Sequence, residues 1–70
     1  MRITYDAVVD ALYIRFEEAQ VTTKHLAEGI AADYDKNGNL AGIEILDALT
    51  RFGDKLTLKK IVLEEIGLAA

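Results

Sequence analysis

The chain contains 70 residues, of which 51% are hydrophobic and 29% are charged, and its formal net charge is −4. This balance is typical of a globular protein rather than a disordered one. A chain of this length buries only roughly 60% of the surface that it exposes when unfolded. With no cysteine and one histidine, it has neither disulfides nor a Cys/His zinc site to reinforce it. We therefore expect one domain, residues 1–70, that is supported by homo-oligomerisation.

The charge and hydropathy patterns also exclude classes of partner. The eight Lys and Arg residues are scattered and outnumbered, which argues against nucleic acid and favours a protein partner of basic character. No segment approaches the ~20 apolar residues of a membrane span. The first residues, MRITYDAVVDALYIRF, are interrupted by Asp6, Asp10 and Arg15 and have no signal-peptide core. We expect a cytoplasmic protein that makes no membrane contact.

The first third of the chain reads as β-structure. The run RITY is rich in β-branched and aromatic residues, and ALYIRF alternates apolar Leu12, Ile14 and Phe16 with Tyr13 and Arg15. The intervening DAVVD is expected to form a turn or bulge. The segment QVTTKH predicts an edge strand, at which Lys24 discourages pairing with another sheet.

The segment DYDKNGNLAGIE, Asp33 to Glu44, fits the calcium-loop pattern D-x-[DN]-x-[DN]-G-x5-E. An EF-hand needs a helix on each side of this loop. Helical spacing is present after Glu44, but an entering helix is not indicated. Of the four positions that such a helix should fill with apolar residues, only one is suitable; they are held by Ala32, Gly29, Glu28 and His25.

The same segment fits a β-hairpin better. Asn37-Gly38 is a strong signal for a two-residue type I′ turn. The turn would pair Lys36 with Asn39, Tyr34 with Ala41, Ala32 with Ile43 and Ile30 with Ile45. This register places the apolar residues on one face and Asp33, Asp35 and Glu44 on the other. We predict a hairpin with a solvated acidic face, no metal site and no useful affinity for calcium.

The C-terminal segment predicts a helix over about residues 54–66. Asp54 can act as its N-cap and Gly67 as its C-terminal stop. Leu58, Ile61, Val62 and Ile66 form one apolar stripe, while Leu56 and Leu63 lie on an adjoining face. One side can cover a sheet and the other can meet a partner or a second copy. The expected fold is therefore α+β: a small antiparallel β-meander of about four strands over about residues 1–46, packed by a C-terminal helix.

The residues give no indication of catalysis. The chain has no serine or cysteine to act as a nucleophile, and His25 stands on a predicted polar edge. A thin sheet with one helix provides no deep cleft to separate the pKa values of paired carboxyls. A glycine-rich phosphate loop is also missing. We expect no catalytic residues, no cofactor and no enzymatic activity.

Two blocks, YDAVVDALYI and DYDKNGNLAGIEILDA, resemble those of the small prokaryotic family named domain of unknown function 2283. The resemblance spans roughly Thr4 to Ala48. Members often carry proline or an acid after Tyr-Asp, where this chain has Ala7-Val8-Val9. The resemblance implies a compact antiparallel sheet with a helix and no established activity. Members are often encoded beside RelE-like toxin-fold proteins, which implies an antitoxin-like role by association only.

The residues in the matching blocks are interpreted first as structural residues. Tyr5, Leu12, Ile14, Ile43 and Ile45 are expected in the core. Asp6 and Asp10 are expected to bind backbone in turns or caps, and Gly42 is expected at a bulge or close approach.

Three functions remain at this stage. The first is a protein-interaction module, antitoxin-like, that binds a small basic protein. For it, Asp33, Asp35 and Glu44 are candidate steering charges, and Leu56 and Leu63 are candidate contacts. The second is a calcium or small-ligand module built on Asp33, Asp35, Asn37 and Glu44. The third is an accessory subunit that only oligomerises.

Overall fold

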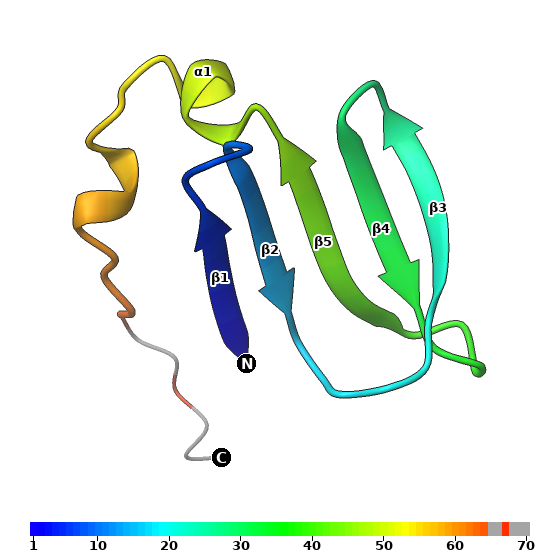
Figure 1. The fold of residues 1–70 in the computed structure, drawn as a ribbon. Helices are drawn as coiled ribbons and strands as arrows, with labels where there is room; N and C mark the ends of the chain where they lie inside the picture. The colour runs from blue at the N-terminus through cyan, green and yellow to red at the C-terminus, as the bar shows by residue number, and fades with distance from the viewer. Residues whose placement is uncertain (65–66, 68–70) are drawn as a thin grey trace.

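A computed structural model describes residues 1–64 and Gly67. It contains one antiparallel sheet with the strand order β1-β2-β5-β4-β3 (Figure 1). The elements are β1 (Arg2–Asp6), β2 (Ala11–Arg15), β3 (Thr22–Ala27), β4 (Ile30–Tyr34), β5 (Leu40–Leu46), the helix α1 (Ala48–Phe52) and the 3-10 turn η1 (Thr57–Lys59). The α+β antiparallel prediction is confirmed, with five strands in place of about four. No helix in the described residues is long and apolar enough to cross a membrane.

The last strand in the chain lies in the middle of the sheet. β5 pairs with β2 on one side and with β4 on the other, while β1 and β3 form the two edges. The predicted edge strand QVTTKH is thereby confirmed as β3. Because β5 sits beside β2, the two sequence blocks of the family resemblance become neighbours in space.

The predicted β4–β5 hairpin is confirmed, but its turn differs. Ile30 pairs with Ile45 and Ala32 with Ile43, as expected, whereas Tyr34 pairs with Leu40 rather than Ala41. The loop has three residues, 36–38, because the Asp35 N–H donates to the Asn39 carbonyl at 2.9 Å. Among the described non-glycine residues only Asp10 and Asp47 have positive φ, so the type I′ turn, which needs it at Asn37, is wrong.

The Asp35 side chain explains this turn. Its Oδ1 accepts hydrogen bonds from the N–H groups of Asn37, at 2.9 Å, and Asn39, at 2.8 Å. Gly38 then takes φ 84°, which the absence of a Cβ permits. The bond from Asn39 lowers the pKa of the Asp35 carboxyl below its usual range.

A bulge restores the predicted register beyond the turn. The β4–β5 register shifts between Asp33 and Tyr34, so Ala41 is an extra residue on β5. Its carbonyl instead accepts the Phe16 N–H at 2.8 Å, beyond the end of β2. The one-residue offset of the longer loop is cancelled by this bulge, and the separation of apolar and acidic faces survives.

The predicted C-terminal helix is wrong over the described residues. Only η1 is helical between Asp54 and Glu64, and Lys60 is extended at φ −139° and ψ 122°. Asp54 does act as expected at the start, since its Oδ1 accepts the Leu56 N–H at 2.8 Å. A short helix that contains β-branched residues is stable only when it packs against another surface. Ile61 and Val62 are more than half exposed here, so they provide no such packing. The predicted helical positions 65 and 66 lie outside the described residues.

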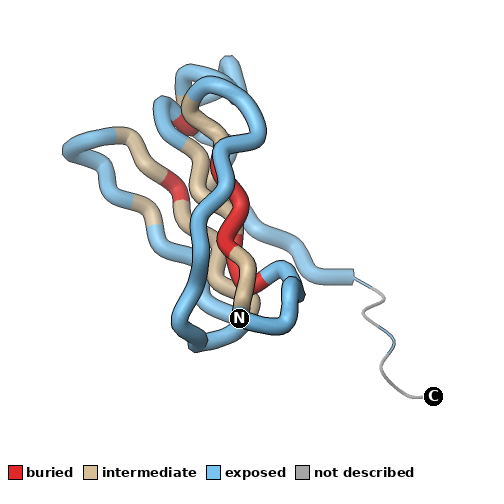
Figure 2. The backbone as a smooth tube through the Cα atoms, turned by 90° about the vertical axis from the view of Figure 1, so that its right-hand side faces the viewer, coloured by how far each residue is buried: buried red, intermediate tan, exposed pale blue. Residues whose placement is uncertain are grey.

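The sheet has little core of its own. Neither α1 nor η1 packs broadly across it. Among residues 1–64 and 67, the buried hydrophobic residues are Leu12 and four alanines, namely Ala31, Ala32, Ala41 and Ala48. Figure 2 shows the buried positions mainly in the strands, with mostly exposed or half-buried chain around them; Ala48, at the start of α1, is also buried. Of the expected core residues, Leu12 is buried, whereas Tyr5, Ile14, Ile43 and Ile45 are half-buried.

Asp10 joins the β1–β2 turn to the helix. Its Oδ1 accepts hydrogen bonds from the Leu49 N–H at 3.0 Å and from the Tyr5 hydroxyl at 2.7 Å. Its carbonyl accepts the Ala48 N–H at 2.9 Å. The residue at the N-cap position, Asp47, makes no side-chain cap hydrogen bond, so Asp10 caps α1 from a distant part of the chain. The expected roles of Asp6 and Asp10 are confirmed, since the Asp6 carboxylate accepts the Val8 N–H at 2.9 Å.

We predict that Asp10→Asn lowers the stability of the fold more than Asp6→Asn does. The Leu49 N–H, followed by the Tyr5 hydroxyl, lowers the pKa of Asp10 in the folded state. A carboxyl with a lowered pKa stabilises the fold above its unfolded pKa of about 3.9, and this contribution is lost as the pH falls. Urea unfolding should therefore show a deficit in Asp10→Asn at pH 7 that shrinks below about pH 4. An equal deficit at both pH values would contradict this account.

Candidate functional site

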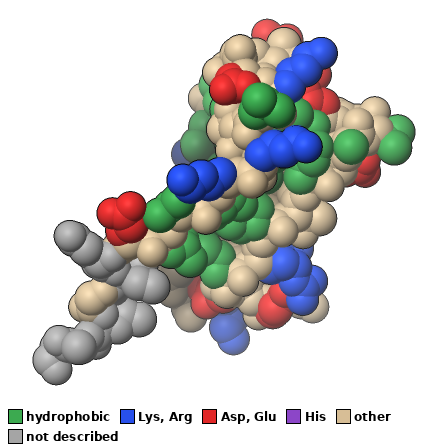
Figure 3. Space-filling model, turned by 90° about the vertical axis from the view of Figure 1, so that its left-hand side faces the viewer, with side chains coloured by type: hydrophobic (Ala, Val, Ile, Leu, Met, Phe, Trp, Pro, Cys, Tyr) green, Lys and Arg blue, Asp and Glu red, His purple; other side chains and the backbone are tan. Residues whose placement is uncertain are grey.

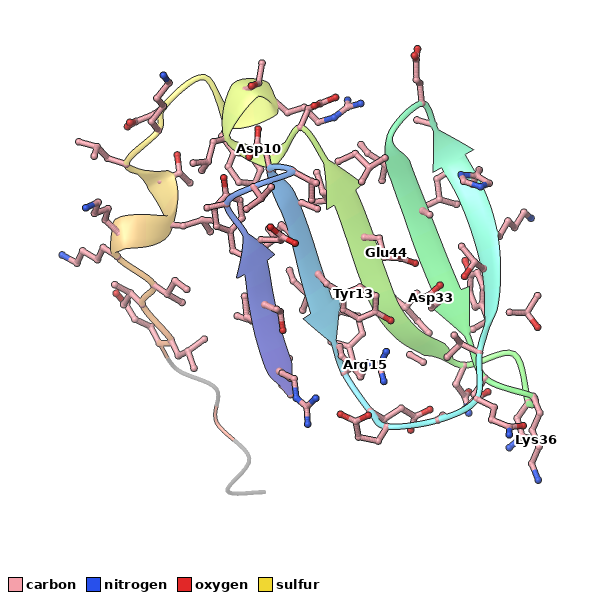
Figure 4. All side chains as sticks on the ribbon, viewed as in Figure 1. Asp10, Tyr13, Arg15, Asp33, Lys36 and Glu44 are labelled. Carbon is pink, nitrogen blue, oxygen red and sulfur yellow. The ribbon has the colours of Figure 1, made fainter. Side chains whose placement is uncertain are left out.

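One face of the sheet, here called the polar face, gathers polar side chains from four strands. The register pairs Tyr13 with Glu44, Gly42 with Asp33, and Asp33 with Thr23, so all of these lie on the same face. Arg15 and His25 share it at alternate positions of β2 and β3. Figure 4 shows Tyr13, Arg15, Asp33 and Glu44 grouped over the centre of the sheet, away from Asp10 and Lys36.

Asp33 is the centre of this group. It is 1% exposed and is the only buried polar or charged residue in the described chain. Its Oδ2 accepts a hydrogen bond from the Tyr13 hydroxyl at 2.5 Å, and its Oδ1 accepts one from the Thr23 hydroxyl at 2.5 Å. These contacts link β4 to β2, two strands away, and to β3. A buried carboxylate requires such donors, since without them its loss of hydration is not compensated.

Gly42 makes the longer of these links possible. Tyr13 lies on β2, and its side chain must cross β5 to reach Asp33 on β4. A Cβ at position 42 would lie 2.9 Å from the Ile14 carbonyl oxygen and 3.1 Å from the Tyr13 hydroxyl. The expectation of a close approach at Gly42 is thus confirmed: the missing side chain leaves room for the tyrosine ring.

Arg15 covers the outer side of Tyr13. Its guanidinium carbon lies 5.0 Å from the centre of the tyrosine ring, and its Nη2 donates to the Tyr13 hydroxyl at 3.3 Å. Its Nη1 donates to Glu18 at 2.8 Å. The arginine therefore ties the group to the loop after β2.

The pKa values of the two carboxyls of the polar face, Asp33 and Glu44, are shifted in opposite directions. Burial opposes ionisation of Asp33, but hydrogen bonds from Thr23 and Tyr13 outweigh it and lower the pKa of that carboxyl. Burial and the neighbouring Asp33 carboxylate raise the pKa of Glu44. The bond to the Asp33 carboxylate likewise raises the pKa of the Tyr13 hydroxyl. The face thus holds one firmly ionised carboxylate beside one that retains its proton more readily.

A small hollow adjoins Glu44. It has a volume of about 130 Å³ and is lined by Thr23, His25, Gly29, Ile30, Ala31, Glu44 and Leu46. Ligand pockets for small molecules are commonly about 300–1,000 Å³. No group of three or more His, Cys, Asp or Glu in residues 1–64 and 67 is arranged to hold a metal ion. The hollow can accept a small polar group such as a side-chain tip.

Of the predicted site residues, the structure brings only Asp33 and Glu44 together. Asp33 is enclosed by Tyr13 and Thr23 and has no exposure to steer a partner. Asp35 is occupied by its own turn, and Glu44 is half-buried beside Asp33. Leu56 and Leu63 are 64% and 70% exposed, on the segment after α1. The predicted solvated acidic face is therefore corrected to a hydrogen-bonded polar face with a buried carboxylate.

Sequence reasoning missed Tyr13, Thr23 and Arg15 as members of this face. Alternation in ALYIRF already placed Tyr13 and Arg15 opposite the apolar residues of the same strand. What it did not give was the position of β5 between β2 and β4. That non-local pairing is what brings Tyr13 within reach of Asp33.

We predict that Tyr13→Phe destabilises the protein by about 1.5–3 kcal/mol, since it removes a donor from a buried charged acceptor. The matched control is Tyr34→Phe, because the Tyr34 hydroxyl makes no side-chain hydrogen bond within the described chain. Chemical unfolding of both variants at pH 7 measures the difference. Equal losses in the two variants would show that the link to Asp33 adds nothing to stability.

We predict that Glu44→Gln stabilises the protein at neutral pH. The raised pKa of Glu44 means that ionisation is disfavoured in the fold, so wild-type stability falls as the pH rises from about 4.3 through the folded pKa. Glutamine cannot ionise and avoids this loss. Thermal unfolding should show an advantage for Glu44→Gln at pH 7 that disappears near pH 4. Glu28→Gln, on an exposed turn, is the control for the loss of one carboxyl at pH 7. A variant less stable than wild type at pH 7 would contradict the prediction.

A family model matches residues 2–48, which is more than half of the chain and includes every strand together with the start of α1. Its description is Protein of unknown function (DUF2283). No curated protein and no solved structure matches the chain. The matched range contains Tyr5, Asp10, Tyr13, Asp33 and Gly42, which make the contacts described above. The chain therefore belongs to the family of proteins of unknown function DUF2283.

Proposed function

We propose that this protein is a non-catalytic protein-interaction module, antitoxin-like, whose partner is a small basic protein bound by the segment after α1. The observation that carries the proposal is the exposure of large apolar side chains on residues 54–64, here called the tail. Leu56, Ile61, Val62 and Leu63 are each more than half exposed. An exposed apolar segment whose regular structure is limited to the single turn η1 is typical of a sequence that becomes ordered on binding another surface.

The position of the tail supports this role. Figure 1 shows the tail running outside the β1 edge of the sheet, separate from the polar face. Figure 3 shows hydrophobic side chains gathered on this side of the molecule, with Lys and Arg side chains above and below them. A partner bound there would cover the tail and the adjoining sheet edge together, which resembles strand addition to an exposed edge.

Net charge supports a basic partner. Residues 1–53 carry the whole net charge of −4, because nine carboxylates there outnumber five Lys and Arg, while the remaining residues balance three against three. Exposed carboxylates such as Glu17, Glu28 and Asp47 would attract the basic partner. The buried Asp33 would not. Electrostatic attraction of this kind raises association rates and weakens with salt.

The alternative functions have weaker support. Calcium binding would need Asp33, Asp35, Asn37 and Glu44 to turn their oxygens towards one point, whereas Asp33 and Asp35 are held by hydrogen bonds of their own. Small-ligand binding would rest on the hollow of about 130 Å³ beside Glu44 or on one of about 360 Å³ beside Asp35 and Asn37, which is lined mainly by exposed residues. A non-catalytic role is part of the proposal, and the shielding of the Asp33 carboxylate supports it.

The proposal is tested by isolating the partner from the native cell and measuring its binding to purified variants. We expect Leu56→Asp combined with Leu63→Asp to weaken binding at least about tenfold, since each buried leucine contributes roughly 1.5–3 kcal/mol. The matched control is Val8→Asp, at a turn residue that is 93% exposed on the β1–β2 connection. The association rate should also fall as salt is added.

Two outcomes would contradict the proposal. The first is equal binding by the tail variant and wild type. The second is a partner whose association rate does not change with ionic strength, which would exclude charge steering.

A further inference from the structure

The face opposite the polar face is apolar across four strands. The register aligns Ile3, Ile14, Ile43 and Ala32 in one row that runs across β1, β2, β5 and β4. It aligns Tyr5, Leu12, Ile45 and Ile30 in a second row. These eight residues are here called the apolar face. Cross-strand neighbours of this kind form a continuous surface, because residues directly opposite one another lie ~4.5–5.5 Å apart.

In the described chain no helix or strand forms a second layer over the apolar face, although Leu12 and Ala32 are buried within it. Only neighbouring strands are in broad contact with one another. Ile14, Ile43 and Ile45 belong to β2 and β5, inside the sheet, and yet they are only half-buried. A sheet must bury its hydrophobic face against another layer to form a stable domain.

The chain exposes more surface than a compact domain of its length. It exposes 5709 Å², whereas a folded monomer of this length exposes about 4,300 Å². The exposed tail contributes to this excess together with the apolar face, on which Ile3 is 42% exposed and Ile14, Ile43 and Ile45 are half-buried.

The dimensions of the face also fit an interface. Four strands ~4.8 Å apart, each with about five residues at ~3.4 Å per residue, span roughly 330 Å² in projection. Two such faces pressed together remove on the order of 1,000 Å² of accessible surface once protruding side chains are included, which is about the lower limit for a specific interface.

The distribution of charge points to a second copy as the occupant. The acidic chain should repel itself, but Asp33 and Glu44 lie on the polar face. The one charged strand residue in register with the apolar rows is Lys24, which pairs with Ala32 at the β3 edge. The Asp10 carboxylate lies beside the face, but the Tyr5 hydroxyl and the Leu49 N–H already donate hydrogen bonds to it. Two copies can therefore meet over the apolar rows without opposing free carboxylates, and a basic partner would find none in those rows to recognise.

We propose that the apolar face packs against the same face of a second copy, so that the functional unit is a two-layer, face-to-face homodimer. The contact is isologous and closes on itself, as in most soluble homodimers. The two sheets lie ~10 Å apart with interdigitated isoleucines, and the polar faces point outwards. The interface lies on the sheet and not at Leu56 and Leu63, where the predicted helix would have placed it.

The first test uses the wild-type protein. Sedimentation should show a dimer, and the urea midpoint should rise with protein concentration over a roughly 100-fold range, because dissociation accompanies unfolding. A monomer whose unfolding does not depend on concentration would overturn the proposal.

The second test identifies the surface. The chain has no cysteine, so Ile43→Cys places a single thiol in the apolar face and His25→Cys places one on the polar face. The thiol of Ile43→Cys should react with a labelling reagent at least about tenfold more slowly at concentrations that favour the dimer than after dilution. The thiol of His25→Cys should react equally fast at both concentrations.

Each other outcome of the thiol test overturns the proposal. A dimer in which the thiol of Ile43→Cys stays fully reactive has its interface elsewhere. A monomer in which that thiol is protected at every concentration has its apolar face covered by its own chain. The partner-binding proposal depends on the tail, so Leu56→Asp combined with Leu63→Asp should leave the dimer intact, and either proposal can fail without the other.

Discussion

The pairing of β5 with β2 on one side and β4 on the other is the constraint on which the rest of the structure depends. It places Gly42 under the Tyr13 ring and brings Tyr13 to Asp33. The same pairing aligns Ile14 with Ile43 and Leu12 with Ile45, so both faces are assembled by one strand insertion. Such long-range pairing is slow to form, because loop closure must be completed before contacts compensate for it.

The two faces of the sheet are stabilised by different interactions. On the polar face, the Asp33 carboxylate receives its donors from within the chain, from Tyr13 and Thr23. Hydrogen bonds are directional and saturable, so this face is finished in a single copy. The apolar face is held by a non-directional force that scales with the area removed from water, and one layer of strands removes too little. In this chain of 70 residues, the polar face satisfies its hydrogen bonds internally, whereas the apolar face needs a second surface to bury it.

Sequence predicted those features that depend on neighbouring residues. Alternation gave the separation of faces, and the Ile30–Ile45 and Ala32–Ile43 pairs followed from the hairpin register. The type I′ turn was wrong because the Asp35 carboxylate organises a longer loop, a side-chain effect that the Asn-Gly signal does not contain. The helix over residues 54–66 was wrong because periodicity reports the capacity for an apolar stripe and not a surface to receive it. The burial of Asp33 depends on strand order, which local pattern does not determine.

The three-residue loop and the bulge at Ala41 are one-residue offsets in opposite directions from a plain two-residue turn. The two faces of the sheet are set by the pairs beyond the bulge, Asp33 with Gly42 and Ala32 with Ile43, and not by the turn itself. A change in the number of loop residues leaves these pairs available, so isoleucines and carboxylates keep their faces. The tip of this hairpin is therefore a place where the fold can accept a longer or shorter loop.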